Sequence, residues 1–329
     1  MKISVVVPTY NRADLLPVTL DAILAQTLPP HEVIVIDDGS CDETPSVLRH
    51  YASAVRGRTI ENAGELVARN TGLRMATGDL VSFCDSDDLW RPDLLASMAE
   101  LWRRAPGVRT AYCDFVIVRE DIRGDQNKFA GAPEGFWDDL RVVGPELGVF
   151  DSAVIDRLIR YQPFFPSCMT VDREFFLSLG GWDEAASRIV GCDFATTLRV
   201  GEHPPIGVVR KPLVGIRKHA GNFSADVQKM NLGDARILEL VLASRPSLAE
   251  HRKVIEESIA IRRRDALNAA FARHDFESVK SIYPLLPLAS RSPALRIKHH
   301  VANWPAIGRG IAAATLLLAG SVSGHLHTR

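Results

Sequence analysis

The first third of the chain alternates between two hydrophobic patterns. Runs of consecutive apolar residues, many of them β-branched, are typical of strands that are buried on both faces. Such runs lie within residues 3–8, 32–37, 79–85 and 109–118, and residues 58–61 form a weaker strand-like segment. Between them, apolar residues recur three and four positions apart, which indicates one buried face of a helix. These helix-like segments are residues 13–26, 42–52, 64–78 and 91–105.

This alternation predicts the fold class. Strands that alternate with helices in units of roughly 30 residues form right-handed crossovers and a parallel sheet. We therefore expect an α/β domain with a Rossmann-like, mostly parallel sheet flanked by helices. In such sheets, ligands bind outside the carboxyl ends of the strands.

The pattern weakens after this region and then changes character. Residues 120–166 contain scattered Gly, Pro and aromatic residues, and we expect either an extended loop or a few short helices there. Regular segments return at residues 168–184, 189–201 and 207–224, whereas the chain beyond them reads as helices throughout. We place a boundary near residue 225, with an α/β domain at 1–225 and a helical C-terminal extension at 226–329.

Two acidic clusters follow predicted strands. Asp37 and Asp38 end one strand, and the stretch VSFCDSDDLWRP places Asp85, Asp87 and Asp88 at the end of another. Because parallel strands deliver their carboxyl ends to the same edge of the sheet, both clusters are expected there. Aspartates this close repel one another unless a cation or a donor relieves them. Either they hold a divalent cation, or they cap the helix that begins near Pro92.

Composition and charge restrict the function. The net charge is -1, which gives no reason to expect a nucleic-acid partner. The five cysteines are widely spaced and form no CxxC pair, which argues against a disulfide framework and fits a reducing compartment. The N-terminal apolar run stops at Pro8 and is too short for a secretory signal. We therefore expect a cytoplasmic protein.

Several separated blocks carry a family resemblance. In order, they read VVVPTYNR, VIDDGSCDET, VARNTGLRMATGD, FCDSDDLWRP, LGGWDE and KHAGNFS. Their order and spacing resemble the family 2 glycosyltransferases, which are inverting enzymes of the GT-A fold that use nucleotide-diphosphate sugars. The resemblance covers about the first 225 residues and leaves the helical extension outside it.

The resemblance implies a nucleotide site and a metal site. Its nucleotide-binding residues are Pro8, Thr9, Tyr10, Arg12, Asp37, Asp38, Arg69, Asn70, Asp85 and Ser86. Among them, Asp38 accepts a hydrogen bond from the base and Asp37 supports the turn. The implied cofactor is Mg2+ or Mn2+, with Asp87 as the direct metal ligand, Asp85 beside the ribose or the metal, and His219 completing the site. A packed or surface role for His219 remains the alternative.

The resemblance also implies a general base, with one departure from the family pattern. The family places a Glu-Asp pair after its Gly-Gly-aromatic-Asp-Glu block, and here Asp193 keeps the base position while Cys192 replaces the Glu. Asp183 is the reserve candidate for the base, and Asp193 as a helix cap is the alternative. Trp182 is expected either beneath the acceptor or in the core.

We therefore expect an enzyme that transfers one sugar from a nucleotide-diphosphate sugar, by preference a UDP-sugar. The acceptor would be a hydroxyl group of a saccharide, lipid-linked or protein molecule in cell-surface polysaccharide or glycoconjugate biosynthesis. Two alternatives stay open: a relative that binds nucleotide sugar without turnover, and a sugar-nucleotide nucleotidyltransferase. The latter should carry a Gly-rich loop after the first strand, and PTYNRADLLP contains no glycine.

The end of the chain raises a question of membrane contact. Basic residues, Trp304 and an apolar stretch at residues 311–319 lie close together in the sequence. The stretch is too short to span a bilayer, which takes roughly 20 residues. It either lies in the membrane interface, as a peripheral contact at the inner face, or forms a final helix docked on the domain.

Overall fold

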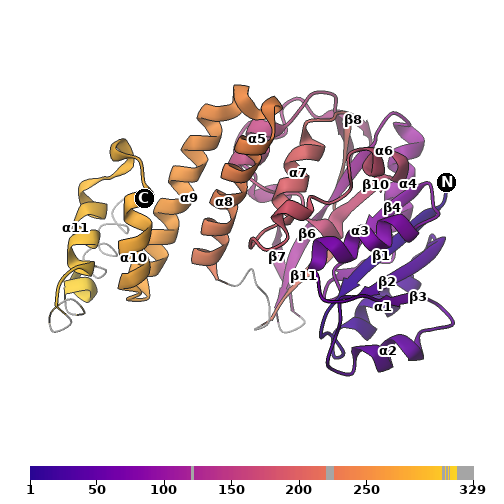
Figure 1. The fold of residues 1–329 in the computed structure, drawn as a ribbon. Coiled ribbons are helices and arrows are strands. Elements are labelled where there is room, and N and C mark those ends of the chain that lie inside the picture. Colours follow the sequence, from indigo (N-terminus) through magenta and orange to yellow (C-terminus); the bar gives the residue numbers. More distant parts are fainter. Residues whose placement is uncertain (120–121, 220–225, 306–307, 309, 311, 317–329) are drawn as a thin grey trace. The chain divides into compact units, whose positions relative to one another are not determined.

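Figure 1 shows the computed structural model of the chain, which describes residues 1–329 except 120–121, 220–225, 306–307, 309, 311 and 317–329. It contains two compact units. The first comprises residues 1–188 and 192–222, and the second comprises 189–191 and 223–329. The chain passes from the first unit to the second for the last time between residues 222 and 223.

An eleven-stranded sheet forms the centre of the first unit. Its strands are β1 (Ile3–Thr9), β2 (Glu32–Asp37), β3 (Arg56–Thr59), β4 (Leu80–Phe83), β5 (Leu89–Trp90), β6 (Thr110–Arg119), β7 (Ile122–Asn127), β8 (Arg141–Gly144), β9 (Leu147–Phe150), β10 (Met169–Asp172) and β11 (Ile206–Lys218). Their order is β3-β2-β1-β4-β10-β6-β11-β9-β8, with β5 paired to β11 and β7 paired to β6.

The sheet combines a parallel half with a mixed half. Strands β3, β2, β1 and β4 are parallel to their neighbours, as expected from the first third of the sequence. Strand β10 then enters antiparallel between β4 and β6, and β11 runs parallel to β6. The α/β class with a central sheet flanked by helices is confirmed, while the mostly parallel arrangement applies to the N-terminal half.

Helices cover both faces of the parallel half. The helices of this unit are α1 (Leu16–Leu24), α2 (Thr44–His50), α3 (Glu65–Met75), α4 (Leu94–Arg104), α5 (Ile155–Arg160), α6 (Arg173–Ser178) and α7 (Asp193–Gly201). Val5 and Val7 of β1 share one core with Leu20 of α1 and the buried residues of α4. Val6 points to the opposite face, where a Cβ added to Gly72 of α3 would lie 2.4 Å from Val6 Cγ1. The alternation along β1 therefore builds two layers of helices around the sheet.

The segment at residues 120–166 differs from its expectation as a loop or short helices. Its described part holds three strands, β7, β8 and β9, in addition to the short helix α5. Strand β9 is buried and pairs antiparallel with β11, whereas β8 lies beyond it with its first residues exposed. Strands this short take their conformation from their partners, so the local hydrophobic pattern did not reveal them.

The second unit is helical, as expected. Its helices include α8 (Val227–Ser244), α9 (Arg252–Ala272), α10 (Phe276–Ile282) and α11 (Pro293–Ala302). Phe271 of α9, Val279 of α10 and Leu295 of α11 belong to one buried cluster. Within the described ranges, no helix is long and apolar enough to cross a membrane.

Candidate active site

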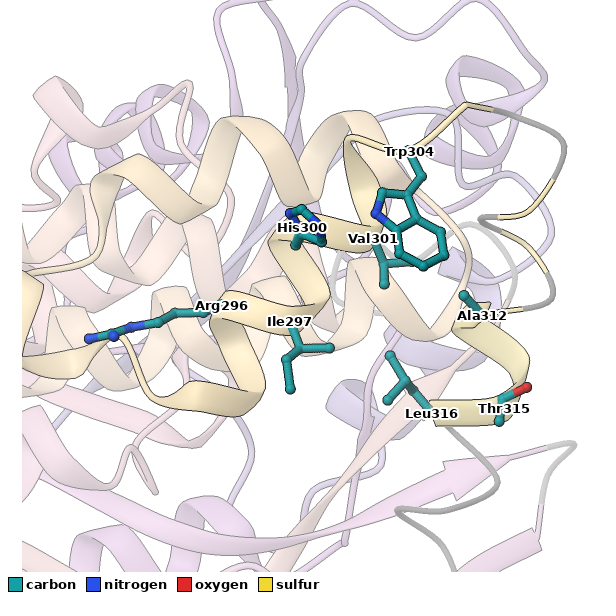
Figure 2. Close-up of a pocket in the computed structure, with 8 residues that line it drawn as sticks. All are labelled: Arg296, Ile297, His300, Val301, Trp304, Ala312, Thr315 and Leu316. Carbon is teal, nitrogen blue, oxygen red and sulfur yellow. The ribbon is translucent and has the colours of Figure 1, made fainter.

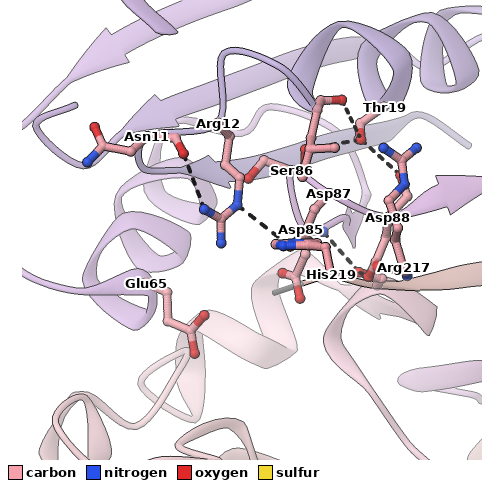
Figure 3. Close-up of polar contacts among 12 residues, drawn as sticks. Asn11, Arg12, Thr19, Glu65, Asp85, Ser86, Asp87, Asp88, Arg217 and His219 are labelled. Atoms are coloured by element: carbon pink, nitrogen blue, oxygen red, sulfur yellow. Dashed lines mark hydrogen bonds and ion pairs between the residues drawn. The ribbon is translucent and has the colours of Figure 1, made fainter. Parts of the chain in front are cut away.

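The predicted site residues gather where β1, β2, β4 and β11 end. Figure 3 shows the core of this arrangement, which we call the strand-end site. It is defined by Arg12, Arg69, Asp85, Ser86, Asp87, Asp88 and His219. The carboxyl-end rule for parallel strands therefore places both acidic clusters at one edge, as expected.

Asp85 is held by Arg69. The Arg69 Nη2 donates to Asp85 Oδ1 at 2.6 Å, and the Arg69 side chain is only 1% exposed. Burial alone disfavours a charged guanidinium, but the carboxylates of Asp85 and Glu65 raise the pKa of Arg69 above its usual value. The Asp85 main-chain N–H donates to Ser167 Oγ at 2.9 Å. Asp85 is therefore fixed on one side by a buried cation and on the other by a hydroxyl group.

Asp87 faces two basic side chains. Its Oδ2 lies 2.9 Å from His219 Nε2 and 3.6 Å from Arg12 Nε. The structure thus brings together two of the three predicted metal ligands, while Asp85 turns toward Arg69. In the described part of the chain, no group of three metal-binding side chains is assembled. Mg2+ often takes only one or two protein carboxylates and leaves its other positions to water and phosphate oxygens, so Asp87 and His219 fit such an ion.

Asp88 has a structural role that sequence reasoning missed. Its carboxylate is buried and accepts hydrogen bonds from Ser167 Oγ at 2.5 Å and from the Arg217 N–H at 3.0 Å. These bonds tie the loop after β4 to the end of β11, which carries His219 two residues after Arg217. Because both partners lie far away in the sequence, no local signal could have identified them. Asp88 thereby helps to place Asp87 beside His219.

The other residues of the loop after β4 are fixed from α1. Thr19 Oγ1 lies 3.1 Å from the carbonyl oxygen of Ser86 and 3.0 Å from that of Asp88. Ser86 is itself buried, so its contribution to the strand-end site is made through the loop backbone that Thr19 holds. The predicted contact of Ser86 with a nucleotide stays a prediction.

The loop after β1 presents one exposed aromatic residue. Pro8 and Thr9 are buried in β1, and Tyr10, which follows them, is 44% exposed. Thr9 Oγ1 is buried and has no hydrogen-bond partner among the described residues. Asn11 Oδ1 accepts from the Cys41 N–H at 2.8 Å, which binds this loop to the turn after β2. Tyr10 is therefore the member of the predicted nucleotide set that is open for stacking.

Asp37 and Asp38 both bind main-chain groups. Asp37 Oδ1 accepts from the Ser40 N–H at 3.0 Å, which is the turn-supporting role expected for it. The two carboxylate oxygens of Asp38 accept from the Ala63 and Gly64 N–H groups at 2.8 and 2.9 Å. Asp38 therefore fixes the start of α3, and its predicted hydrogen bond to a nucleotide base stays a prediction.

Asn70 holds the loop of Trp182, and Trp182 occupies the core position that was one of its two expected places. Asn70 Nδ2 donates to the Trp182 carbonyl at 2.9 Å and to Glu184 Oε1 at 2.7 Å, while Asn70 Oδ1 accepts from the Trp182 N–H at 2.7 Å. Both the amide nitrogen and the amide oxygen of Asn70 thus hold the loop of Trp182, and its predicted place near a nucleotide stays a prediction. The Trp182 side chain is 2% exposed and packs edge-on against Phe83, which is the core position expected as the alternative to an acceptor contact.

The two candidate bases lie on either side of a short loop. Asp193 is the first residue of α7, where the helix dipole favours a negative charge, and Cys192 occupies the cap position before it. Burial raises the pKa of the Tyr112 hydroxyl, and the negative charge of Asp193 raises it further. The Asp183 N–H donates to Thr196 Oγ1 at 2.9 Å. The role of Asp193 as general base, with Asp183 in reserve, stays a prediction.

Comparisons with known proteins decide the family. The model of the family described as "Glycosyl transferase family 2" matches residues 4–129. The chain is 31% identical over 172 residues to the "Putative teichuronic acid biosynthesis glycosyltransferase TuaG" of Bacillus subtilis, covering 51% of this chain and 67% of TuaG. The chain belongs to glycosyltransferase family 2. The resemblance seen in the motifs is thus confirmed, and the protein is a glycosyltransferase.

Solved structures support the GT-A fold of this family 2 glycosyltransferase. S. aureus TarS residues 1–349 in complex with UDP aligns with a TM-score of 0.61 at 17% identity, over 100% of this chain and 93% of TarS. The mannosyltransferase PcManGT of Pyrobaculum calidifontis, in complex with GDP-Man and Mn2+, aligns with a TM-score of 0.53 at 22% identity, over 100% and 88%. Several other curated relatives are matched over less than half of their own length.

Proposed function

We propose that this glycosyltransferase transfers a single sugar, with inversion, from a UDP-sugar to a hydroxyl group of a saccharide in cell-surface polysaccharide synthesis. The observation that carries the proposal is the strand-end site, where Asp87 lies against His219 and Arg12 while Arg69 fixes Asp85 nearby. A diphosphate needs cationic partners, and a bound cation needs carboxylate and imidazole ligands. The strand-end site supplies both.

The donor would bind with its base toward the loop of Tyr10 and its diphosphate toward Asp87. Tyr10 is exposed and can stack on a base, as aromatic side chains do in nucleotide sites. Arg12 lies at the same loop and can contact a phosphate oxygen. TarS is described in complex with UDP, and this supports UDP as the first nucleotide to test.

Asp87 and His219 would hold Mg2+ or Mn2+ in this site. PcManGT, a structural neighbour, is described with Mn2+ and a nucleotide sugar. When bound, such an ion would supply positive charge to the leaving diphosphate. The chain itself contributes Arg12, which stands 3.6 Å from Asp87 and adds a fixed positive charge on the phosphate side.

Asp193 would act as the general base of the transfer. It accepts the proton of the acceptor hydroxyl while that oxygen forms a bond to the anomeric carbon, and the bond from this carbon to the diphosphate oxygen breaks. The electron pair leaves with UDP. Because the acceptor attacks from the face opposite the leaving group, the anomeric configuration inverts. The acceptor class is inferred from TuaG, whose name assigns it to teichuronic acid biosynthesis.

The donor half of the proposal is tested by thermal shift with UDP, GDP, dTDP and CMP, each with and without Mn2+. A ligand at 100 times its dissociation constant stabilises the native state by about 2.7 kcal/mol. We expect a rise in midpoint with UDP and Mn2+ that Asp87→Asn removes. The matched control is Asp14→Asn, an exposed carboxylate that is not among the site contacts and should leave the rise intact.

Three results of this panel would contradict parts of the proposal. A shift with UDP that is equal with and without metal would count against the metal role of Asp87. A shift with another nucleotide alone would change the donor. A metal-dependent shift without transfer to any saccharide acceptor would favour the relative that binds nucleotide sugar without turnover.

We also propose that α11 and residues 312–316 contact an anionic membrane surface; the rest of the apolar stretch at 311–319 lies outside the described residues. A groove of about 640 Å³ is present there. The side chains that line it are drawn in Figure 2: Arg296, Ile297, His300, Val301, Trp304, Ala312, Thr315 and Leu316. Ile297 is 50% exposed and Trp304 is 42% exposed, so an apolar surface and an interfacial aromatic lie beside the positive charge of Arg296. This combination is typical of helices that bind in the membrane interface.

Vesicle co-sedimentation tests the membrane contact. We expect the chain to sediment with phosphatidylglycerol vesicles and to lose that binding in Ile297→Glu, because a carboxylate would enter the apolar surface and oppose the anionic lipid. Ile261→Glu, which changes an exposed apolar residue on α9, is the matched control. Equal sedimentation with and without vesicles would contradict the proposal, as would loss of binding in both variants.

A further inference from the structure

Glu65 joins the strand-end site to the loop before Asp193. It is the first residue of α3, and its Oε2 lies 3.4 Å from Arg69 Nη2, the same nitrogen that holds Asp85. Its other oxygen, Oε1, accepts a hydrogen bond from Cys192 Sγ at 2.8 Å. One carboxylate therefore contacts both the buried cation of the strand-end site and the residue that precedes the candidate base.

The charges of these groups favour this contact. The Arg69 charge holds the pKa of Glu65 below its usual range, so Glu65 is ionised. Burial of Cys192, together with the nearby Glu65 charge, raises the pKa of the thiol, which therefore keeps its proton. A protonated thiol beside a carboxylate makes a charge-assisted hydrogen bond, which is stronger than a bond between neutral groups.

The hydrogen bond between Cys192 and Glu65 affects Asp193 because Cys192 directly precedes it. Cys192 is the cap residue of α7, and Asp193 follows it as the first helical residue. The Cys192 side chain makes no capping bond to its own helix, and its thiol points instead to Glu65. An acidic residue in the first turn of α3 would serve the helix dipole without any of these contacts. Helix stabilisation alone therefore does not account for the Glu65 geometry.

We propose that Glu65 is a positioning residue for transfer, which holds the start of α7 through Cys192 and so sets the orientation of Asp193. This inference rests on the proposed function, because it assigns Glu65 to the same base. It also offers an account of Cys192: the carboxylate that the family pattern places at this position comes instead from α3. Glu65 on α3 then supplies the negative charge, and Cys192 at the start of α7 supplies the hydrogen-bond donor.

Kinetics of a double-mutant cycle test the assignment. We expect Glu65→Gln and Cys192→Ala each to lower kcat by about 10-fold to 100-fold, because a small misplacement of a reacting group has effects of this size. The KM for UDP-sugar and the thermal midpoint should stay close to wild type. The double variant should be no slower than the slower single variant, since Glu65→Gln removes the charge that strengthens this hydrogen bond and Cys192→Ala removes its donor.

Two further variants separate positioning from a structural role. Cys192→Ser keeps a donor for Glu65, and we expect its kcat to remain within about 3-fold of wild type. Cys192→Glu, introduced into Glu65→Gln, returns a carboxylate to the same place and should recover most of the lost kcat. The matched control is Glu61→Gln, an exposed carboxylate shortly before α3, which should change neither kcat nor KM.

The outcomes distinguish failure of this inference from failure of the proposed function. Additive losses in the double variant would overturn the assignment, as would a normal kcat in Glu65→Gln. Parallel falls in kcat and thermal midpoint in Glu65→Gln, without recovery by Cys192→Glu, would assign Glu65 a structural role instead. If the wild-type chain neither transfers nor hydrolyses any sugar nucleotide, the proposed function fails and the assignment of Glu65 fails with it.

Discussion

Asp88 offers a direct test of how the strand-end site is assembled. Its buried carboxylate accepts from Ser167 Oγ and from the Arg217 N–H, which lie on two different segments. Asp88→Ala removes both acceptors and leaves the Arg217 N–H buried without its partner. A buried polar group without a partner costs about 1–3 kcal/mol. We expect a loss of about 3 kcal/mol in the free energy of unfolding, because two such bonds are affected.

The asparagine variant provides the comparison for this measurement. Asp88→Asn keeps an oxygen for the Arg217 N–H and offers an N–H group to Ser167 Oγ, so we expect it to cost less than about 1 kcal/mol. In a thermal scan, one kcal/mol shifts the midpoint of a unit of this size by about 2–4 °C. Asp88→Ala should therefore melt about 6–12 °C below wild type, and Asp88→Asn within a few degrees. Equal midpoints for the two variants would refute the role of the hydrogen bonds.

Three further predictions concern single residues. Asn70→Ala removes every bond between Asn70 and the loop of Trp182 and should lower the unfolding free energy by about 2–4 kcal/mol in denaturant titrations; a loss below 0.5 kcal/mol would count against the clamp. Arg69→Lys replaces the guanidinium whose Nη2 contacts both Asp85 and Glu65 by a shorter ammonium group and should reduce transfer by about 10-fold or more with normal circular dichroism; wild-type turnover would contradict this. Burial raises the pKa of Asp234 to about 6, although the Arg262 charge opposes the rise. The folded state therefore favours the protonated carboxyl, and the stability that this proton provides is fully present below pH 4 and is lost as the pH rises through 6. Wild type should therefore lose up to about 3 kcal/mol of unfolding free energy between pH 4 and pH 7, and Asp234→Asn should not show this loss. If the difference between the two proteins does not change with pH, the pKa of Asp234 is not raised.

The sequence predicted those elements whose formation depends on residues close together in the chain. The continuous apolar runs of β1 and β2 and the helical spacing in α1 are set by burial of neighbouring residues, so their periodicity alone identified them. The rule that parallel strands end at one edge then placed Asp37 and Asp87 at the same edge before any coordinates were known. The helical character of the second unit followed from the same periodicity.

The remaining features depend on partners that are distant in sequence. Strand β9 exists because β11 pairs with it, and its few residues carry no pattern of their own. In the sequence, Asp88 cannot be distinguished from the neighbouring aspartates, and its role follows only from its hydrogen bonds with Ser167 and the Arg217 N–H. Trp182 lies in a motif that suggested substrate contact, yet Asn70 holds its backbone and its ring packs against Phe83 and Phe176 in the core. The proposed role of Glu65 likewise depends on its contact with Cys192, which is distant in the sequence.

The most direct test of the central claim is the stereochemistry of transfer, followed by NMR, for wild type and Asp193→Asn. With a UDP-sugar, Mn2+ and a saccharide acceptor, we expect a product of opposite anomeric configuration to the donor. We expect Asp193→Asn to bind UDP with Mn2+ as wild type does and to form no product. Retention of configuration, or wild-type turnover by Asp193→Asn, would contradict an inverting transfer with Asp193 as its base.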